Sequence, residues 1–300
     1  MKVTGFTICR NAIKYGYPLE QSVRSLLPLV DELVIGVGDS EDGTWELIQA
    51  IGDPKIRAFH SQWDMSKRGA GVLLSEQTNL ALERCTGDWA VYLQADELLH
   101  EGDIGTIRAQ LQKHLHRSTE GLSFKYLHFY GSYGVVQDNW CRWYRREVRA
   151  VKIGRGIVSV GDAAGFKLKQ GTHLLRLIRA DARATVYHYG WVRPPLVMVE
   201  KRQHIGRLYD SDQEATVVPP QSDAYEDLGH LRPFAASHPA LMADLVLAHD
   251  WSFESEIDRQ PPRLLRYGRL LAACPRSFAR IVISRLLLAW NTCTPAPELR

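Results

Sequence analysis

Short apolar stretches alternate with amphipathic ones along the first third of the chain, and this alternation constrains the fold most strongly. Stretches of strand length lie at 3–9, 33–37, 56–60 and 89–93, and stretches with helical spacing of apolar residues lie at 18–27, 44–51 and 71–85. Strands that are separated by helices pair in parallel, because each helix returns the chain across one face of the sheet. The sequence therefore predicts an α/β fold with a doubly wound, mostly parallel sheet and helices on both faces.

The strand predicted at 89–93 is short and apolar, and it ends at the polar cluster Gln94-Ala95-Asp96-Glu97. Gly87, just before it, is predicted to end the preceding helix. In an open α/β sheet, ligands bind in the crevice beyond the carboxyl ends of the strands. We therefore expect Asp96 and Glu97 at the mouth of a site. The alternative is a solvated acidic loop that caps the next segment.

The pattern changes beyond this cluster. A helix is predicted at 104–116 and strands at 122–130, 140–151 and 185–189, before Pro194-Pro195 interrupts the pattern. We divide the chain into a first domain, 1–195, and a helical C-terminal extension, 196–300. The extension is basic and amphipathic towards its end, where arginines alternate with apolar groups. Such a segment either lies on an anionic membrane surface or packs as helices on the first domain or on another subunit.

Composition argues against several classes of protein. A formal net charge of +3 is too small to indicate nucleic-acid binding. The five cysteines are far apart without a CxxC pair, which disfavours zinc fingers and disulfides and suits a reducing cytosol. Neither a signal peptide nor an apolar stretch long enough to span a bilayer is visible, so we expect a cytoplasmic protein.

Four elements in a fixed order resemble a known family. A first strand runs into Arg10-Asn11, an acidic turn occupies 38–44, Asn79 lies in the helix before the central strand, and Gly87-Asp88-Trp89 leads to the acidic cluster. Over residues 3–191 the chain resembles an inverting family-2 glycosyltransferase with the fold called GT-A. The resemblance implies a GT-A-type sheet, and the predicted C-terminal helical extension lies beyond the part that it covers.

The resemblance also implies a site for a nucleotide-diphosphate sugar donor. Asp39 matches the aspartate that binds the nucleoside, and Asp96 matches the last aspartate of an Asp-x-Asp motif that binds Mn²⁺ or Mg²⁺. Gln94 stands where the first aspartate of that motif usually is, and an amide brings no charge to a cation. The full set of residues expected to bind the donor is Arg10, Asn11, Asp39, Lys67, Arg68, Asn79, Gln94, Ala95 and Asp96.

The remaining roles fall on residues later in the chain. His188, at a strand end, is the expected second metal ligand, and a buried histidine bonded to the backbone is the alternative. Asp162 is the expected catalytic base, with Glu147 as the second candidate, although an aspartate beside glycine is often a turn residue. Aromatic faces and arginines suit sugars and phosphates, so the acceptor is assigned to Trp140, Arg142 and Trp191. The alternative is an amphipathic strand that buries one face.

These expectations describe a metal-dependent, hexosyltransferase-type enzyme that transfers a sugar with inversion to a glycan or lipid-linked acceptor. The resemblance places it in bacterial cell-surface polysaccharide synthesis. It would be cytoplasmic, with contact between its C-terminal segment and the inner face of the plasma membrane left open. Two other functions compete: a non-catalytic relative that binds a nucleotide or glycan, and a sugar nucleotidyltransferase with a similar sheet and metal chemistry.

Overall fold

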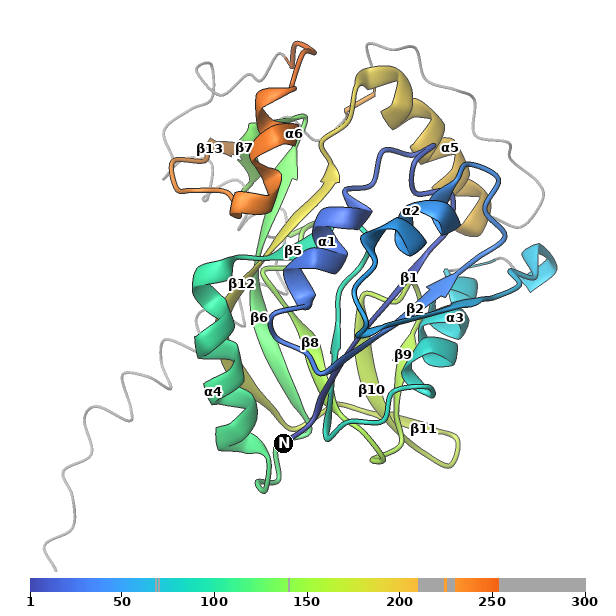
Figure 1. The fold of residues 1–300 in the computed structure, drawn as a ribbon, viewed down its shortest axis with the longest axis vertical. Coiled ribbons are helices and arrows are strands. Elements are labelled where there is room, and N and C mark those ends of the chain that lie inside the picture. Colours follow the sequence, from blue (N-terminus) through green and yellow to red (C-terminus); the bar gives the residue numbers. More distant parts are fainter. Residues whose placement is uncertain (68, 70, 140, 210–223, 226–229, 254–300) are drawn as a thin grey trace, which may run out of the picture.

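The computed structural model describes residues 1–67, 69, 71–139, 141–209, 224–225 and 230–253, and a mixed sheet forms its centre (Figure 1). One half of this sheet is parallel. Its strands lie in the order β3 (Ile56–His60), β2 (Glu32–Val37), β1 (Val3–Cys9) and β4 (Trp89–Tyr92). The chain first builds outward from β1 to β3 and then crosses back to place β4 on the other side of β1. This reversal creates a crevice between the carboxyl ends of β1 and β4.

The other half of the sheet is mainly antiparallel. Beside β4 lie β8 (Arg146–Lys152), β6 (Gly121–Tyr130), β7 (Ser132–Gln137) and β13 (Leu231–Pro233). The long strand β12 (Arg179–Trp191) runs parallel to β6 and also pairs with β5 (Glu97–Leu99). A separate three-stranded sheet contains β9 (Ile157–Val160), β10 (Gly165–Gln170) and β11 (His173–Leu175).

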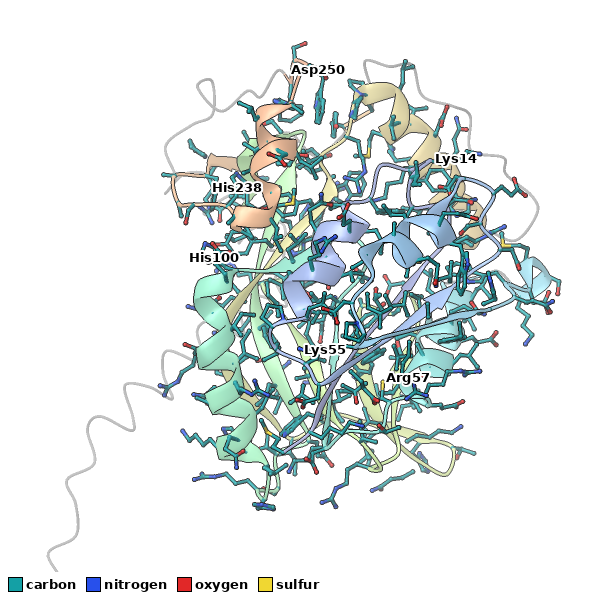
Figure 2. The ribbon with its side chains drawn as sticks, in the orientation of Figure 1. Lys14, Lys55, Arg57, His100, His238 and Asp250 are labelled. Carbon is teal, nitrogen blue, oxygen red and sulfur yellow. The ribbon has the colours of Figure 1, made fainter. Side chains whose placement is uncertain are left out.

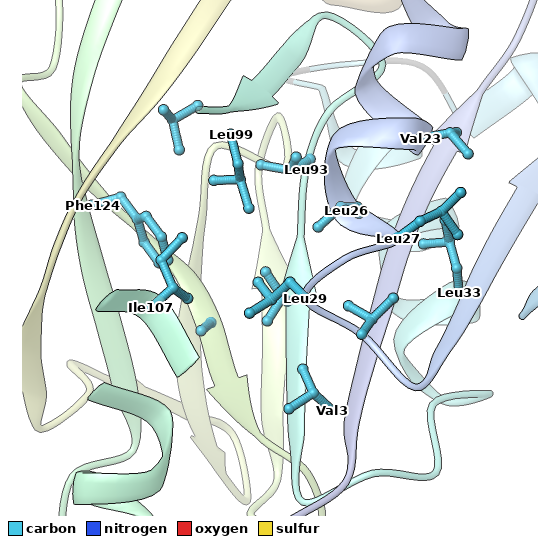
Figure 3. Close-up of a cluster of buried hydrophobic side chains, with 14 of the residues drawn as sticks. Val3, Val23, Leu26, Leu27, Leu29, Leu33, Leu93, Leu99, Ile107 and Phe124 are labelled. Carbon is cyan, nitrogen blue, oxygen red and sulfur yellow. The ribbon is translucent and has the colours of Figure 1, made fainter. Parts of the chain in front are cut away.

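Both faces of the large sheet are covered. On one face lie α1 (Leu19–Leu26), α2 (Thr44–Ile51) and α4 (Ile104–His114), whose apolar side chains share one core with the sheet. Figure 3 shows this core running from Val23 of α1 past Leu29 to Ile107 of α4 and Phe124 of β6. On the other face, α3 (Val72–Leu82) and the three-stranded sheet bury a second core around Phe6 and Tyr92. The predicted doubly wound GT-A fold is confirmed.

Two predicted elements have different limits. The third helix ends at Leu82, so Gly87 does not end it. Gly87 is needed for another reason, because a Cβ there would lie 2.7 Å from the Lys2 carbonyl oxygen where the two segments pass closely. The strand predicted at 140–151 begins only at Arg146. Before this strand the chain turns at Asn139, whose Oδ1 accepts a hydrogen bond from the Cys141 N–H and whose carbonyl oxygen accepts one from the Trp143 N–H.

The described part of the predicted extension packs against the sheet. It contains α5 (Pro195–Tyr209), β13 and α6 (Ala243–Leu247), so it is not wholly helical. His238 lies on the same side of the molecule as His100, whose Nε2 is 3.3 Å from the Ser237 hydroxyl (Figure 2). The Tyr189 hydroxyl lies 2.8 Å from Nδ1 of His238. The basic segment predicted to contact a membrane lies in 254–300, outside the described residues, and within the described ones no helix is long and apolar enough to cross a bilayer.

Candidate active site

A cavity of about 520 Å³ opens at the crevice between the carboxyl ends of β1 and β4. Its wall consists of the segment after β1, the Gln94–Asp96 loop, residues 142–144, residues 162–164, the end of β12 and one face of α5. These segments are distant in the sequence, and the sheet brings them to one edge. The position is the one at which an α/β sheet with reversed strand order binds its ligand.

Asp96 lies in the wall of this cavity and is 6% exposed. Its Oδ2 accepts a hydrogen bond of 3.2 Å from the Lys201 ammonium, and its Oδ1 lies 3.7 Å from His188 Nε2. Burial on its own would raise the pKa of Asp96, but Lys201 and His188 lower it to about 2. The side chain is therefore a carboxylate at neutral pH.

His188 is held by a second buried histidine, His128, whose Nδ1 lies 2.9 Å from His188 Nδ1. His128 Nε2 lies 2.8 Å from the Tyr144 carbonyl oxygen, which only accepts, so this nitrogen carries the proton. Burial, together with the nearby His188, lowers the pKa of His128 to about 3, so its Nδ1 is a free acceptor. His188 must then donate from Nδ1, which leaves a lone pair on Nε2 beside Asp96.

Lys201 is a functional candidate that the sequence reasoning missed. It lies on α5, is 5% exposed, and donates to Asp96 Oδ2 and, at 2.6 Å, to the Gly190 carbonyl oxygen. Burial lowers the pKa of Lys201 to about 8 although Asp96 raises it, so the ammonium form predominates at pH 7. A signal was present, because Lys201 falls on the apolar stripe of its helix between Met198 and Leu208, where a lysine is buried only with a partner.

Gly190 makes room for this cluster. A Cβ at this position would lie 2.8 Å from Asp96 Oδ2 and would also meet the imidazole of His188. We expect Gly190→Ala to lower the free energy of unfolding by about 1–3 kcal/mol, because the added methyl group overpacks a closed cluster. Urea unfolding measures this change. Gly134→Ala is the matched control, since no atom lies within 4 Å of a Cβ built there; equal stability of the two variants would contradict the expectation.

Among the residues predicted to bind the donor, Arg10, Gln94 and Ala95 line the cavity together with Asp96. Arg10 Nε donates to the Asp39 carbonyl oxygen at 3.1 Å. Asp39 itself is exposed outside the cavity wall, and its Oδ2 accepts from the Trp63 backbone N–H.

Three other predicted donor ligands, Asn11, Asn79 and Lys67, lie outside the cavity wall. Asn11 is 7% exposed, and its side-chain oxygen accepts a 2.9 Å hydrogen bond from the Glu41 N–H, which connects the end of β1 to the acidic turn. Asn79 uses both atoms of its amide on the Ser159 backbone, at 3.0 and 2.7 Å, so it fastens α3 to β9. Lys67 forms an exposed ion pair with Glu76. Arg68 is outside the described residues.

The two candidate bases are placed differently. Asp162 lines the cavity, and its Oδ1 accepts a hydrogen bond of 3.2 Å from the Ala164 N–H, as a turn aspartate does. Glu147 is not part of the cavity wall, and its Oε1 accepts from the neighbouring Val148 N–H. Of the two, Asp162 is the carboxylate that a substrate in the cavity can reach.

Aromatic side chains cover the part of the cavity predicted for the acceptor. Arg142 and Trp191 both line it, and Trp191 stacks on Tyr130 with ring centroids 5.5 Å apart. Trp143 packs edge-on against Trp191 at 5.5 Å. Trp140 lies outside the described residues.

Glu97 is not at the mouth of the site, so that expectation was wrong. Asp96 lies in the turn that the Glu97 N–H closes on the Gln94 carbonyl oxygen, and it faces the cavity, whereas Glu97 begins β5 and turns into the core. Arg149 of β8 binds both oxygens of the Glu97 carboxylate at 2.8 Å, and both side chains are fully buried. Arg149 also donates to the Ala164 carbonyl oxygen at 2.7 Å, which ties the Asp162 loop to this ion pair.

The predicted Mn²⁺ or Mg²⁺ can be tested against these side chains. No group of three or more His, Cys, Asp or Glu residues that could hold a metal ion occurs in the described part of the chain. Asp96 Oδ1 and the lone pair of His188 Nε2 supply two ligands. Two ligands suffice when substrate phosphates and water complete the coordination. The pair therefore fits a divalent ion that arrives with a diphosphate.

The doubly wound sheet, with a carboxylate and a histidine facing a cavity at its strand reversal, defines a GT-A glycosyltransferase fold. The chain belongs to glycosyl transferase family 2, whose sequence profile matches residues 7–167, more than half of its length. No curated protein matches the chain.

Solved structures show weaker similarity. TarS 1–349 from S. aureus in complex with UDP is 18% identical over 43% of this chain and 36% of that one, with a TM-score of 0.32. S. aureus TarS is 14% identical over 72% of this chain and 41% of the TarS chain, with a TM-score of 0.40. Glucosyl-3-phosphoglycerate synthase from Mycobacterium tuberculosis, in complex with Mn²⁺, UDP and phosphoglyceric acid, is 20% identical over 42% and 43%, with a TM-score of 0.31. The chain thus spans less than half the length of each.

Proposed function

We propose that this protein transfers a sugar from a nucleotide-diphosphate donor to a hydroxyl group of a glycan or lipid-linked acceptor, with inversion. One observation carries the proposal. In a chain of family 2, the Asp96 carboxylate is buried in a cavity at the strand reversal, between a lysine and a histidine lone pair. A buried carboxylate that is paired with a buried lysine in a cleft is typical of a site that handles charge.

The side chains of the cavity have separate tasks in this reaction. Asp96, His188 and Lys201 lie where the diphosphate leaves, and Arg10 adds positive charge on the same wall. Asp162 accepts the proton of the attacking hydroxyl. The hydroxyl displaces the diphosphate in a single in-line step, and this step inverts the configuration at the anomeric carbon. A divalent ion, Mn²⁺ or Mg²⁺, would be held by Asp96 and His188 and would supply further positive charge for the leaving group.

The stacked rings of Trp191 and Tyr130, with Arg142 nearby, form the part of the cavity that suits a sugar acceptor. Flat aromatic faces pack on sugar rings, and a guanidinium can bind a phosphate in two places. Residues 259–300 would bring the enzyme to the inner face of a membrane if the acceptor is lipid-linked. The family resemblance is the basis for proposing a role in cell-surface polysaccharide synthesis, and a lipid-linked acceptor would suit that role.

A thermal-unfolding screen with UDP, GDP, CDP and dTDP, each with and without Mn²⁺, tests the donor site. A nucleotide present at about 100 times its dissociation constant should stabilise the protein by about 2.7 kcal/mol. The sugar nucleotide of the best ligand is then incubated with acceptor oligosaccharides and lipids. Release of the nucleoside diphosphate together with a glycosylated acceptor supports the proposal.

Three other outcomes count against it. Stabilisation by none of the nucleotides removes the donor site. Release of pyrophosphate from a nucleoside triphosphate and a sugar phosphate identifies a nucleotidyltransferase instead. Tight nucleotide binding without any transfer to the acceptors identifies a non-catalytic binding protein.

A further inference from the structure

Lys201 is almost completely buried in the wall of the proposed donor site. Its ammonium group carries three N–H donors, of which Asp96 Oδ2 and the Gly190 carbonyl oxygen accept two. The ring of Tyr17 lies 4.6 Å from Nζ, as a cation–π contact. One N–H is thus left without an oxygen acceptor among the described residues, beside a cavity that Lys201 itself lines.

The cavity wall carries one more positive than negative side chain before any ligand binds. Gln94 is neutral, and Asp96 is paired with Lys201, so one negative charge faces one positive charge. The other charged side chains of the cavity wall are Arg10, Arg142 and Asp162. A diphosphate carries negative charge, and it would enter a cavity that has three basic side chains and two carboxylates. Close cation–anion contacts are stronger beside buried protein groups than in bulk water.

We propose that Lys201 binds the diphosphate of the nucleotide directly, so that nucleoside diphosphates bind this protein without a divalent ion. The proposal rests on the proposed function, because it assigns a ligand to the same cavity. Its competitor is a purely structural role, in which Lys201 only neutralises Asp96 and holds α5 against the sheet.

Titration calorimetry with UDP, GDP, CDP and dTDP tests this proposal, in EDTA and in Mn²⁺. We expect the unmodified protein to bind its preferred nucleotide in EDTA. Lys201→Gln should weaken that binding at least tenfold in EDTA, whereas Lys201→Arg, which keeps the charge, should retain most of it. Lys113→Gln, an exposed change on α4, is the matched control and should bind like the unmodified protein.

The double variant Asp96→Asn/Lys201→Gln separates direct binding from neutralisation. If Lys201 only neutralises Asp96, removing both charges restores nucleotide binding in EDTA, and the proposal fails. If Lys201 binds the diphosphate, the double variant stays at least tenfold weaker than the unmodified protein. This comparison also covers the case in which Lys201→Gln alone is unfolded, because the double variant leaves no unpaired charge.

The unmodified protein alone can overturn the proposal. Binding that requires Mn²⁺ and vanishes in EDTA contradicts it while leaving the proposed function intact. Absence of binding for every nucleotide under both conditions contradicts the proposed function itself, so the two failures are distinguishable.

Discussion

Asp96→Asn is expected to slow sugar transfer by about 10²–10³-fold, equivalent to about 2.7–4 kcal/mol of transition-state stabilisation. The amide has nearly the same shape, but it removes the charge that faces His188 on one side and Lys201 on the other. His188 and Lys201, which we propose face the leaving diphosphate, would then lose the carboxylate that positions them. The turnover number, measured with the donor identified by the nucleotide screen, checks this expectation.

Two controls accompany this variant. Asp244→Asn removes an exposed carboxylate on α6, outside the cavity wall, and should leave turnover unchanged. Near-ultraviolet circular dichroism shows whether Asp96→Asn is folded, since aromatic rings surround the site. A folded Asp96→Asn protein with full turnover would remove Asp96 from the reaction.

Arg149→Met is expected to lower the free energy of unfolding by about 3–5 kcal/mol, because it leaves the Glu97 carboxylate buried and without its partner. The arginine makes two 2.8 Å hydrogen bonds to that carboxylate, and water reaches neither side chain. Urea unfolding measures the change. Arg57→Met is the matched control, because the Arg57 side chain on β3 is 58% exposed and an ion pair with such an exposed partner contributes only about 0–1 kcal/mol. Its partner Glu32, on β2, keeps its hydrogen bonds from Lys2, Thr4 and Thr86.

The double variant Glu97→Gln/Arg149→Met tests the reason for this loss. It should be more stable than Arg149→Met, because no uncompensated charge remains in the core. A double variant that is as unstable as the single one would show that the arginine acts through its packing and its bond to Ala164, not through the ion pair.

The parallel half of the fold could be predicted from the sequence. Each of its strands and helices is specified by a short stretch of sequence with apolar residues at regular spacing. The helix predicted at 44–51, for example, begins and ends where the pattern predicts. The antiparallel half was harder to predict. The predicted strand at 140–151 is dense in Trp, Tyr and Arg, but the Asn139 turn delays the strand until Arg146.

Residues of the site were predictable only when they adjoin a strand end. Arg10 and Asp96 come shortly after β1 and β4, His188 lies near the end of β12, and the cavity brings the three together. His128 and Lys201 lie within a strand and a helix, so their spacing resembles that of core residues. Asn79 shows the opposite error. It was expected to bind the donor, but its side-chain amide forms hydrogen bonds with the Ser159 backbone instead.

The Asp96–Lys201 pair joins positions 105 residues apart and crosses the border at 195 that the sequence suggested. A protein cut at that border would lose the lysine that neutralises Asp96 and the apolar side chains Met198, Val199 and Leu208 that α5 buries, which strongly opposes folding. The smallest self-standing piece that contains Asp96 must therefore reach through α5. Limited proteolysis should yield no stable fragment that ends between β12 and Lys201.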